Sequence, residues 1–452
     1  MIKSSKTLWP RHLFRDKGIL PTPKLIGFVL ISAVPISLAS YWNIGWLVFI
    51  SLNSTLILAS LVDLWLLPRR NQLICLRSIK ADLERGQDFE GSLQLTNNSK
   101  STIKVRLIDH LPPSFSDPFP LIGKISGGQT ITWFYHSKAS LRGDYELDKV
   151  YFRFTANLTL WEKQVAFPTI SKVRVIPDMS LVRGYLATAQ KSLVAHGLKV
   201  KRNRMGSGEF AQIRTYVPGD DPRKINWRQT AKLSELMTNI YEPEHGKYIT
   251  ILIDCGRTMG VELSHGNRLE RAFEAALTVA AVALKQGDYV SVQAFSNEIK
   301  AYIPPGKGLA HLRTILQGVY NLQVEPVESN YARAFQHLET VQKRRSFLLL
   351  FSDLDPFLFE EKPPFSLQKI RRKHQFLLLS IADPMIAKWL KTEPVTVHLA
   401  MIKSTAQKEA LYKIKSIRQW GRMGIQMLEV PEEKLASEAV SHYIDIINRE
   451  II

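Results

Sequence analysis

The stretch Tyr248–Met259 reads YITILIDCGRTM and decides the fold of the C-terminal half of the chain. Six β-branched, aromatic and aliphatic residues run into Asp254, and a small loop and the hydroxyl of Thr258 follow. A short apolar run of this kind is typical of a strand buried on both faces, as in a parallel sheet. In open α/β sheets, ligands bind just beyond the carboxyl ends of the strands. We therefore expect Asp254 at the edge of the sheet that carries the functional site.

Strand and helix patterns alternate through the rest of residues 248–452. The further strands that we expect are Tyr289–Phe295, an antiparallel Ile299–Ile303, Ser346–Ser352, Gln375–Ile381, Val395–Leu399 and Ile425–Val430. The expected helices are Asn267–Lys285, Leu309–Leu322, Tyr331–Gln342, Thr405–Arg422 and Glu432–Asn448. This alternation predicts an α/β fold, a doubly wound sheet with helices on both faces.

Two long apolar segments, Leu25–Trp42 and Ile44–Leu67, stand near the N-terminus with a short link between them. The second has about 24 residues, which at ~1.5 Å per residue can cross a ~30 Å hydrocarbon core. We predict a two-helix transmembrane hairpin over 25–67 after a basic leader over 1–24, with Asp63 reaching the membrane interface near Arg69.

The orientation of this hairpin follows from its flanks. Basic residues stand at both outer ends, so the positive-inside rule predicts that both termini are cytoplasmic and that the chain is a two-pass protein of the cell membrane with cytoplasmic soluble domains. The alternative is a cleaved signal peptide, because Ser37-Leu38-Ala39 resembles a cleavage site. The second apolar segment would then still return the chain to the cytoplasm.

Residues 71–178 alternate apolar and polar side chains in short runs between turn signals. Examples of these runs are Phe89–Leu95, Lys104–Ile108, Thr130–Tyr135 and Lys149–Phe154. This pattern predicts an antiparallel β-sandwich. The segment groups no His, Cys or carboxylate residues in a catalytic pattern, so we interpret it as a spacer or an interaction module.

The chain carries 60 Lys and Arg against 41 Asp and Glu, a formal net charge of +19. A basic surface of this kind suits an anionic membrane leaflet, nucleic acid or an acidic partner, or is simply solvated. Nucleic acid is disfavoured, because the basic segment Lys199–Lys232 has few aromatic residues to stack on bases. The two cysteines, Cys75 and Cys255, give no disulfide framework and no metal-ligand spacing, which indicates a reducing compartment.

Residues 179–247 begin with a helical pattern, Leu181–Leu198, and then become strongly basic. Asp221 followed by Pro222 is a good start for a short helix that carries Arg223 and Trp227. Two roles are open for Asp220 and Asp221, a metal pair or, as we favour, capping with a salt bridge to Arg223.

The segment from Gly206 to Trp227 contains G-x-G-E-F-x-x-x-R-x-Y-x-P-G-D-D-x-R-x-I-x-W. It resembles the signature of the prokaryotic domain of unknown function 58 family. The order of the segments is also similar to that of the family's proteins: two apolar spans, a β-rich segment, the signature and an α/β domain. The resemblance implies a von Willebrand factor type A-like fold for 248–452 and a membrane-anchored assembly role with a MoxR-type AAA+ ATPase. The candidate partner-binding residues lie in the signature and are Arg214, Asp220, Asp221, Arg223 and Trp227.

Type A domains hold a cation in a metal-ion-dependent adhesion site, D-x-S-x-S with a distant Thr and a later Asp. Carried over by position, the metal ligands would be Asp254, Thr258, Ser329 and Asp353, with Gly256 in place of the middle serine. Two interpretations are open for this degenerate site. A water fills the missing position of a Mg²⁺ ion, or the two aspartates only cap neighbouring loops.

These features favour a non-enzymatic binding and assembly protein, because no complete catalytic constellation is present. The alternative is a metal-dependent hydrolase that uses Asp254 and Asp353, with Asp355 and Asp220 or Asp221 in support. Cys255 is disfavoured as a nucleophile, since His265 alone lies near it in sequence.

Overall fold

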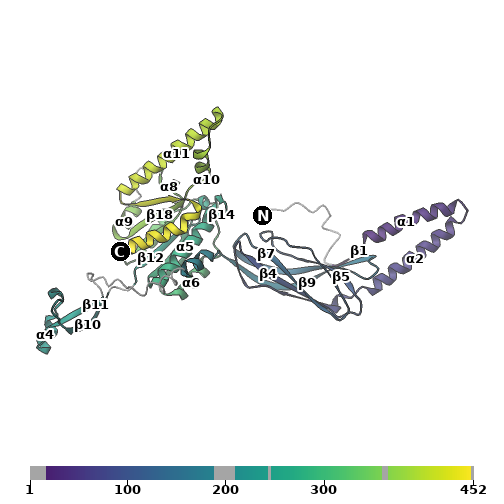
Figure 1. The fold of residues 1–452 in the computed structure, drawn as a ribbon, viewed down its shortest axis with the longest axis horizontal. Coiled ribbons are helices and arrows are strands. Elements are labelled where there is room, and N and C mark those ends of the chain that lie inside the picture. The colour runs from purple at the N-terminus through teal and green to yellow at the C-terminus, as the bar shows by residue number, and fades with distance from the viewer. Residues whose placement is uncertain (1–16, 188–208, 243–245, 359–364, 449–452) are drawn as a thin grey trace. The chain divides into compact units, whose positions relative to one another are not determined.

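The computed structural model describes residues 17–187, 209–242, 246–358 and 365–448. The chain forms two compact units, Met1–Ile176 and Pro177–Ile452. Figure 1 labels the elements of both units. The basic residues Lys199, Lys201, Arg202 and Arg204 and the Gly206-Ser207-Gly208 segment lie outside the described residues.

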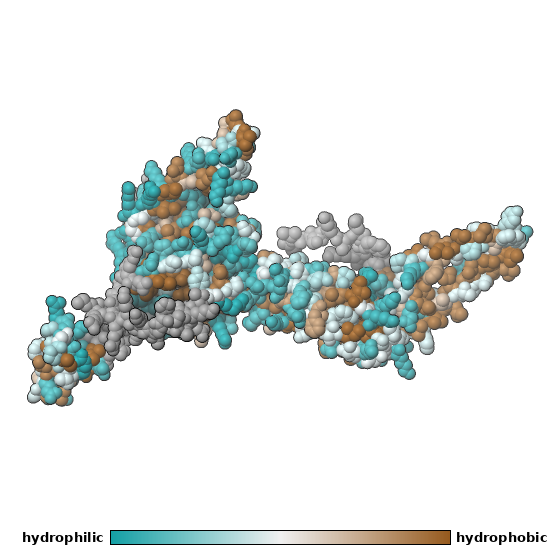
Figure 2. All heavy atoms as spheres, viewed as in Figure 1, coloured by the Kyte–Doolittle hydropathy of each residue, from teal (hydrophilic) through white to brown (hydrophobic). Residues whose placement is uncertain are grey.

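The first unit contains two helices long and apolar enough to cross a membrane, α1 (Pro23–Ser40) and α2 (Gly45–Leu66). Thr22 caps α1 by accepting a hydrogen bond from the Leu25 N–H, and Pro23 supplies the fixed φ that suits the first helical position. The surface of both helices is predominantly hydrophobic (Figure 2). The predicted apolar hairpin is therefore present.

Two sheets form the β-domain of this unit and enclose one apolar core. One sheet has the order β1 (Lys17–Pro21), β9 (Trp161–Ile176), β8 (Gly143–Thr155), β5 (Ile103–Asp109), β6 (Leu121–Ile125), and β3 (Asp82–Glu84) pairs with β9. The other has the order β2 (Leu73–Ser78), β4 (Asp88–Asn97), β7 (Thr130–Lys138), and the short 3-10 turn η1 (Arg70–Gln72) precedes it. The four strand runs that the sequence suggested lie within β4, β5, β7 and β8.

Two parts of this domain differ from the prediction. The predicted leader contributes β1, which pairs antiparallel with β9, and β3 pairs with β9 in parallel rather than antiparallel. The 16-residue β9 escaped the sequence pattern because its first seven residues do not alternate between buried and exposed positions. Pro168 also interrupts it.

Asp63, predicted to reach the membrane interface near Arg69, contacts the β-domain, and its place relative to a membrane stays a prediction. Its side chain is fully buried, and its carboxylate accepts hydrogen bonds from the backbone N–H groups of Leu160 (2.8 Å) and Trp161 (3.0 Å) at the start of β9. Charge-assisted bonds of this kind are about twice as strong as neutral ones, which makes burial of the carboxylate tolerable. α2 is therefore fixed to the β-domain through this aspartate.

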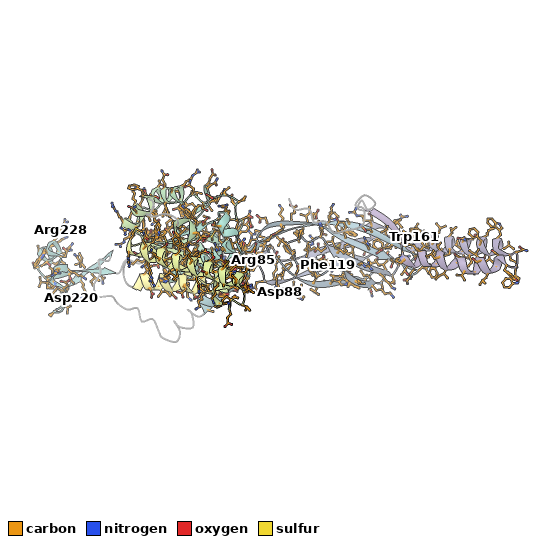
Figure 3. All side chains as sticks on the ribbon, turned by 90° about the horizontal axis from the view of Figure 1, so that it is seen from above. Arg85, Asp88, Phe119, Trp161, Asp220 and Arg228 are labelled. Carbon is orange, nitrogen blue, oxygen red and sulfur yellow. The ribbon has the colours of Figure 1, made fainter. Side chains whose placement is uncertain are left out.

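Two further contacts tie the helical hairpin to the same loop. The Thr22 hydroxyl donates to the carbonyl of Thr159 (2.6 Å), and the indole N–H of Trp161 donates to the Ser60 hydroxyl (2.6 Å). Trp161 lies where the β-domain meets the two helices (Figure 3). Both apolar helices are thus held by residues 159–161.

The second unit contains a six-stranded sheet of order β16, β15, β12, β17, β18, β19. Its strands are β12 (Tyr248–Asp254), β15 (Tyr289–Phe295), β16 (Ile299–Gly306), β17 (Phe347–Phe351), β18 (Gln375–Ile381) and β19 (Gln426–Val430). All neighbours pair in parallel except β16, which is antiparallel to β15. The predicted doubly wound sheet is present, with Asp254 at the carboxyl end of a central strand.

Helices cover both faces of this sheet (Figure 1). Ile249, Ile251 and Ile253 face a layer made by α5 (Arg268–Gln286), α6 (Leu309–Val319) and α12 (Leu435–Asn448). Leu252, Leu348 and Leu350 face the other layer, to which α7 (Tyr331–Val341), α8 (Asp355–Leu358), α9 (Phe365–Lys373) and α11 (Val397–Arg422) belong. Short elements complete the domain: η3 (Arg257–Gly260), β13 (Glu262–Leu263), β14 (Gly266–Asn267) and η4 (Glu432–Lys434).

The predicted strand Val395–Leu399 is wrong. The side chain of Thr396 accepts a hydrogen bond from the Leu399 N–H and caps α11, which begins at Val397 rather than at Thr405. Helix α10 (Pro384–Lys391) precedes it and was not predicted, although Asp383 and Pro384 give it an ordinary helix start. β18 instead pairs directly with β19, which leaves no place for a strand between them.

We predict that Asp63→Ala lowers the free energy of unfolding of the purified full-length chain, because two buried N–H groups lose their acceptor. Each unsatisfied buried group costs about 1–3 kcal/mol. Denaturant titration in detergent, followed by tryptophan fluorescence, measures the change. Asn53→Ala is the matched control, because Asn53 is only half-buried on α2 and its side chain donates to the Phe49 carbonyl of its own helix. Equal effects of the two substitutions would contradict the docking role of Asp63.

Candidate functional site

Asp254 is the centre of the site at the carboxyl edge of the sheet, and its side chain is fully buried. One carboxylate oxygen, Oδ1, accepts from the Gly256 N–H (2.8 Å) and from the Ser329 hydroxyl. The other, Oδ2, accepts from the hydroxyls of Tyr331 (2.9 Å) and Ser352 (2.6 Å). A carboxylate has about four lone-pair positions, so protein donors satisfy this one completely.

The four donors come from segments that are far apart in the sequence. Ser329 and Tyr331 flank Asn330, whose side chain caps α7, and Ser352 directly follows β17. β12 and β17 are parallel neighbours, so their carboxyl ends meet at one edge. Asp254 therefore joins the ends of two strands to the start of a helix.

Tyr331 is held as a hydrogen-bond donor. Burial raises the pKa of its hydroxyl well above the ordinary value, and the negative charge of Asp254 raises it further. The Tyr331 hydroxyl also contacts the Ser352 hydroxyl (2.9 Å). The phenol thus stays protonated at any pH near neutrality.

Gly256 stands where the adhesion-site pattern has its middle serine, and the packing explains the glycine. A Cβ atom at this position would lie 2.0 Å from the Ser329 Oγ, well inside van der Waals contact. The Ser329 hydroxyl fills the space that a side chain at position 256 would need. The loop is held there by backbone bonds from the Arg257 N–H to the Val327 carbonyl (2.9 Å) and from the Glu325 N–H to the Cys255 carbonyl (2.8 Å).

Asp353 is also buried, and its charge is balanced by a cation of the protein itself. The Arg268 Nη1 lies 2.7 Å from the Asp353 Oδ2, and less than a tenth of either side chain is exposed. Burial raises the pKa of Asp353, while the Arg268 guanidinium acts in the opposite direction. Arg268 also lines a small cavity with Met259 and Ser352, and within the described part of the chain its buried Nε has no hydrogen-bond partner.

The sequence-predicted metal ligands are only partly brought together. Ser329 contacts Asp254 as its place in the pattern suggests. Thr258 lies half-buried in η3, while the hydroxyls that contact Asp254 are those of Ser329, Tyr331 and Ser352. Asp353 is paired with Arg268.

These residues, as arranged, do not fit a Mg²⁺ ion. Such an ion takes oxygen ligands with free lone pairs. All lone pairs of the Asp254 carboxylate accept hydrogen bonds from the protein, and Asp353 forms an ion pair with Arg268. In the described ranges no group of three or more His, Cys, Asp or Glu residues is placed to hold a metal. The Mg²⁺ site stays a prediction of the resemblance alone.

Two other candidate site residues, Asp355 and Cys255, are engaged in ion pairing or core packing. Asp355 forms an ion pair with the buried Lys413 (3.1 Å), which also binds Glu429. Cys255 is fully buried and belongs to the apolar core on the α5 side of the sheet. Neither side chain is placed as a nucleophile or as a second metal ligand.

The described part of the signature forms a small unit of its own elements, here called the signature unit (residues 209–242). β10 (Glu209–Thr215) and β11 (Met237–Glu242) pair antiparallel and enclose the 3-10 turn η2 (Pro222–Lys224) and the helix α4 (Trp227–Leu233). Figure 3 labels Asp220 and Arg228 in this unit.

Arg214 and Asp220 fix the turn of the signature unit. The Arg214 Nη2 lies 2.8 Å from the Asp220 Oδ1, and Oδ2 accepts from the Val217 N–H (3.1 Å). The hydrogen bond from Arg214 is the main cause of a lowered pKa at Asp220. Asp221 caps η2 through the Arg223 N–H (3.0 Å), so the predicted capping is present. The ion pair expected with Arg223 is wrong and is made by Arg214 instead.

The predicted single helix after Asp221 is divided in two. Asn226 caps a second start by accepting from the Gln229 N–H (3.1 Å), so Trp227 is the first residue of α4. The side chain of Trp227 is 68% exposed. Three further large apolar residues of the unit are exposed, namely Val217, Leu233 and Leu236. Among the side chains of the signature unit that the structure describes, one tryptophan and three large aliphatic residues are therefore exposed.

Residues 212–404 match the model of a family described as "Protein of unknown function DUF58". Among similar curated proteins, the uncharacterized protein YeaD of Bacillus subtilis (strain 168) is 23% identical over 51% of this chain and 60% of its own length. The uncharacterized protein Rv1480 of Mycobacterium tuberculosis (strain ATCC 25618 / H37Rv) is 21% identical over 39% of this chain and 55% of its own. The chain thus spans little more than half of these relatives, and the family resemblance seen in the sequence is confirmed.

Two solved structures align with parts of the chain. The conserved hypothetical protein BatB from Bacteroides thetaiotaomicron aligns with a TM-score of 0.30 and 12% identity, covering 45% of this chain and 100% of its own. A PapD-like domain of human CEP192 aligns with a TM-score of 0.17 and 12% identity, covering 24% of this chain and 89% of its own.

We predict that Asp254→Ala lowers the free energy of unfolding by about 3 kcal/mol or more, because four donors, in two buried and two partly buried hydrogen bonds, lose their acceptor. Glu328→Ala is the control from the same loop, since Glu328 forms an exposed ion pair with Arg257 that is worth less than about 1 kcal/mol. Denaturant titration of the full-length chain compares the two. If Asp254→Ala unfolded at the same denaturant concentration as the control, the hydrogen-bonded junction would not hold this edge together.

Proposed function

We propose that this chain, which belongs to the DUF58 family through residues 212–404, is a membrane-anchored, non-enzymatic protein that binds and helps to assemble other proteins. The observation that carries this proposal is the exposure of large apolar side chains in the signature unit. Trp227 is 68% exposed, and Val217, Leu233 and Leu236 are exposed near it in sequence. A tryptophan exposed among other large apolar residues is typical of an interaction site, because such side chains dominate the energy of protein interfaces.

The anchor in this proposal is the α1–α2 hairpin. Both helices have the length and composition of membrane spans, and Arg69 and Arg70 follow the second helix directly. Basic residues at the outer ends of a hairpin favour cytoplasmic termini. The proposed protein is therefore a two-pass protein of the cell membrane with both soluble domains in the cytoplasm.

The hydrogen bonds and ion pairs of Asp254, Asp353 and Asp355 support a binding role over the hydrolase alternative. A two-metal hydrolase built on Asp254 and Asp353 needs these carboxylates free to hold metal ions. Asp254 is satisfied by four protein donors, Asp353 is paired with Arg268, and Asp355 is paired with Lys413. Mg²⁺-dependent hydrolysis of a phosphoester by the purified full-length chain, lost in Asp254→Ala, would favour the hydrolase instead.

The parallel sheet with one antiparallel edge strand supports the von Willebrand factor type A-like fold that the family resemblance implies. We propose that the carboxyl edge is a degenerate adhesion site. At this edge, hydroxyl groups donate hydrogen bonds to Asp254 and the Arg268 guanidinium pairs with Asp353. In a complete adhesion site, a cation would bind these carboxylates instead.

The proposed partner is a MoxR-type AAA+ ATPase, and this choice comes from the family resemblance. The signature unit suggests how such a partner binds. Trp227 and the other exposed apolar side chains of the unit suit an apolar recess in the partner. Arg223 and Arg228, which are exposed and near Trp227 in sequence, suit an acidic rim. The Arg214–Asp220 pair holds the turn between β10 and α4 in place for that contact.

We predict that Trp227→Ala lowers the recovery of the AAA+ ATPase at least about tenfold, because truncating a central interface tryptophan commonly costs 2 kcal/mol or more. Cross-linking in the native membranes, followed by purification of the full-length chain, measures the recovery. Phe365→Ala is the matched control, since Phe365 is 82% exposed on α9, outside the signature unit.

If Trp227→Ala recovered as much ATPase as the wild type, the signature unit would not be part of the interface. A loss in both variants would point to a general effect of removing exposed aromatic side chains. If Trp227→Ala alone also unfolded at lower denaturant concentration, its side chain would be packing within the chain rather than against a partner.

A further inference from the structure

The α10–α11 hairpin reaches beyond the sheet that anchors it. The C-terminal half of α11 packs on the domain, where Trp420 is buried in the core and Lys413 binds both Asp355 and Glu429. The N-terminal part of α11 extends away from the sheet with α10 beside it (Figure 1). Lys403 joins the two helices by donating to the Thr392 carbonyl (3.0 Å).

Large apolar side chains are exposed at this outer end. The exposed residues are Met385 (51%), Leu390 (36%), Val395 (86%), Val397 (76%) and Met401 (66%). They lie on α10, on the connection and on the first turns of α11, here called the hairpin tip (residues 384–403). Figure 2 shows hydrophobic residues gathered at the outer end of α11. Water-exposed apolar side chains at this density mark a contact site with a partner or a membrane.

The charges beside these residues have one dominant sign. Lys388, Lys391 and Lys403 lie in the hairpin tip, against Glu393 as the one acidic residue in 384–403. Lysine has a long apolar stem, so its ammonium group can stay in the headgroup layer while neighbouring apolar side chains enter the acyl region. Apolar side chains flanked by lysines are the composition of a helix that lies in the interface of an anionic membrane.

We propose that the hairpin tip is a peripheral membrane-contact site that binds anionic phospholipid headgroups and inserts its apolar side chains between them. The inference rests on the proposed anchoring by α1 and α2, which keeps the domain near a bilayer and so raises the effective concentration of lipid. The exposed side chains come from two helices and their connection and are mainly aliphatic, so they suit a deformable lipid layer more than a fixed protein pocket. The protein then contacts the membrane at two places, through its anchor and through this tip.

The test uses the full-length chain in vesicles, with Met401→Cys carrying an environment-sensitive fluorophore. The natural Cys75 and Cys255 are buried and do not compete for the label. Glu298→Cys is the matched control, an exposed position of the same domain outside the hairpin. Vesicles contain phosphatidylcholine alone or phosphatidylcholine with phosphatidylglycerol, and brominated lipids report contact with acyl chains by quenching.

We expect a blue shift and quenching at position 401 in the anionic vesicles, and neither change at position 298. Adding Lys388→Gln and Lys391→Gln should weaken the contact about fivefold for each lysine, because each contributes about 1 kcal/mol near an anionic surface. A label at position 401 that stays in water in the anionic vesicles would overturn the proposal. So would a blue shift that grows with protein concentration in detergent, because a second copy of the chain would then cover the tip.

Flotation of the same vesicles separates this inference from the anchor. Chain that fails to float with neutral vesicles contradicts the anchoring by α1 and α2. Chain that floats with both kinds of vesicle, while position 401 remains in water, contradicts the hairpin contact alone.

Discussion

The hydrogen bonding of Asp254 is the constraint on which the carboxyl edge of the sheet depends. A buried carboxylate is costly unless donors surround it, and here a backbone N–H and three hydroxyls do so. These donors belong to the loop after β12, the start of α7 and the end of β17, so one side chain determines how three segments meet. The same saturation leaves no lone pair for a cation or for proton transfer, which ties the structural role of Asp254 to the non-enzymatic function that we propose.

A similar arrangement holds the other unit together. Asp63 is buried in α2 and bonds two backbone N–H groups at the start of β9, while Arg77 and Asp109 form a buried ion pair inside the β-domain that Tyr135 joins through its hydroxyl (3.0 Å). These buried carboxylates accept hydrogen bonds from donors in distant segments.

The sequence predicted those elements whose pattern is local. β12, β15 and β18 were predicted from their apolar runs, and Asp254 was placed correctly because a strand end is visible in one chain. Ser352 could have been found too, since it ends the strand next to β12. Tyr331 and Arg268 could not, because their contacts depend on how helices approach the edge. The strand expected at Val395–Leu399 failed because a threonine cap outweighed the β-branched residues around it.

The central claim is that protein donors alone hold the edge around Asp254 together, without a cation. Titration of Mn²⁺ into the full-length chain, with the free-ion paramagnetic resonance signal as the readout, tests it most directly in wild type and Asp254→Ala side by side. The account predicts that both proteins take up Mn²⁺ to the same small extent, because the oxygens of Asp254 are already occupied by protein donors. Saturable uptake of one ion per chain in the wild type, absent in Asp254→Ala, would contradict it and restore a working adhesion-type metal site.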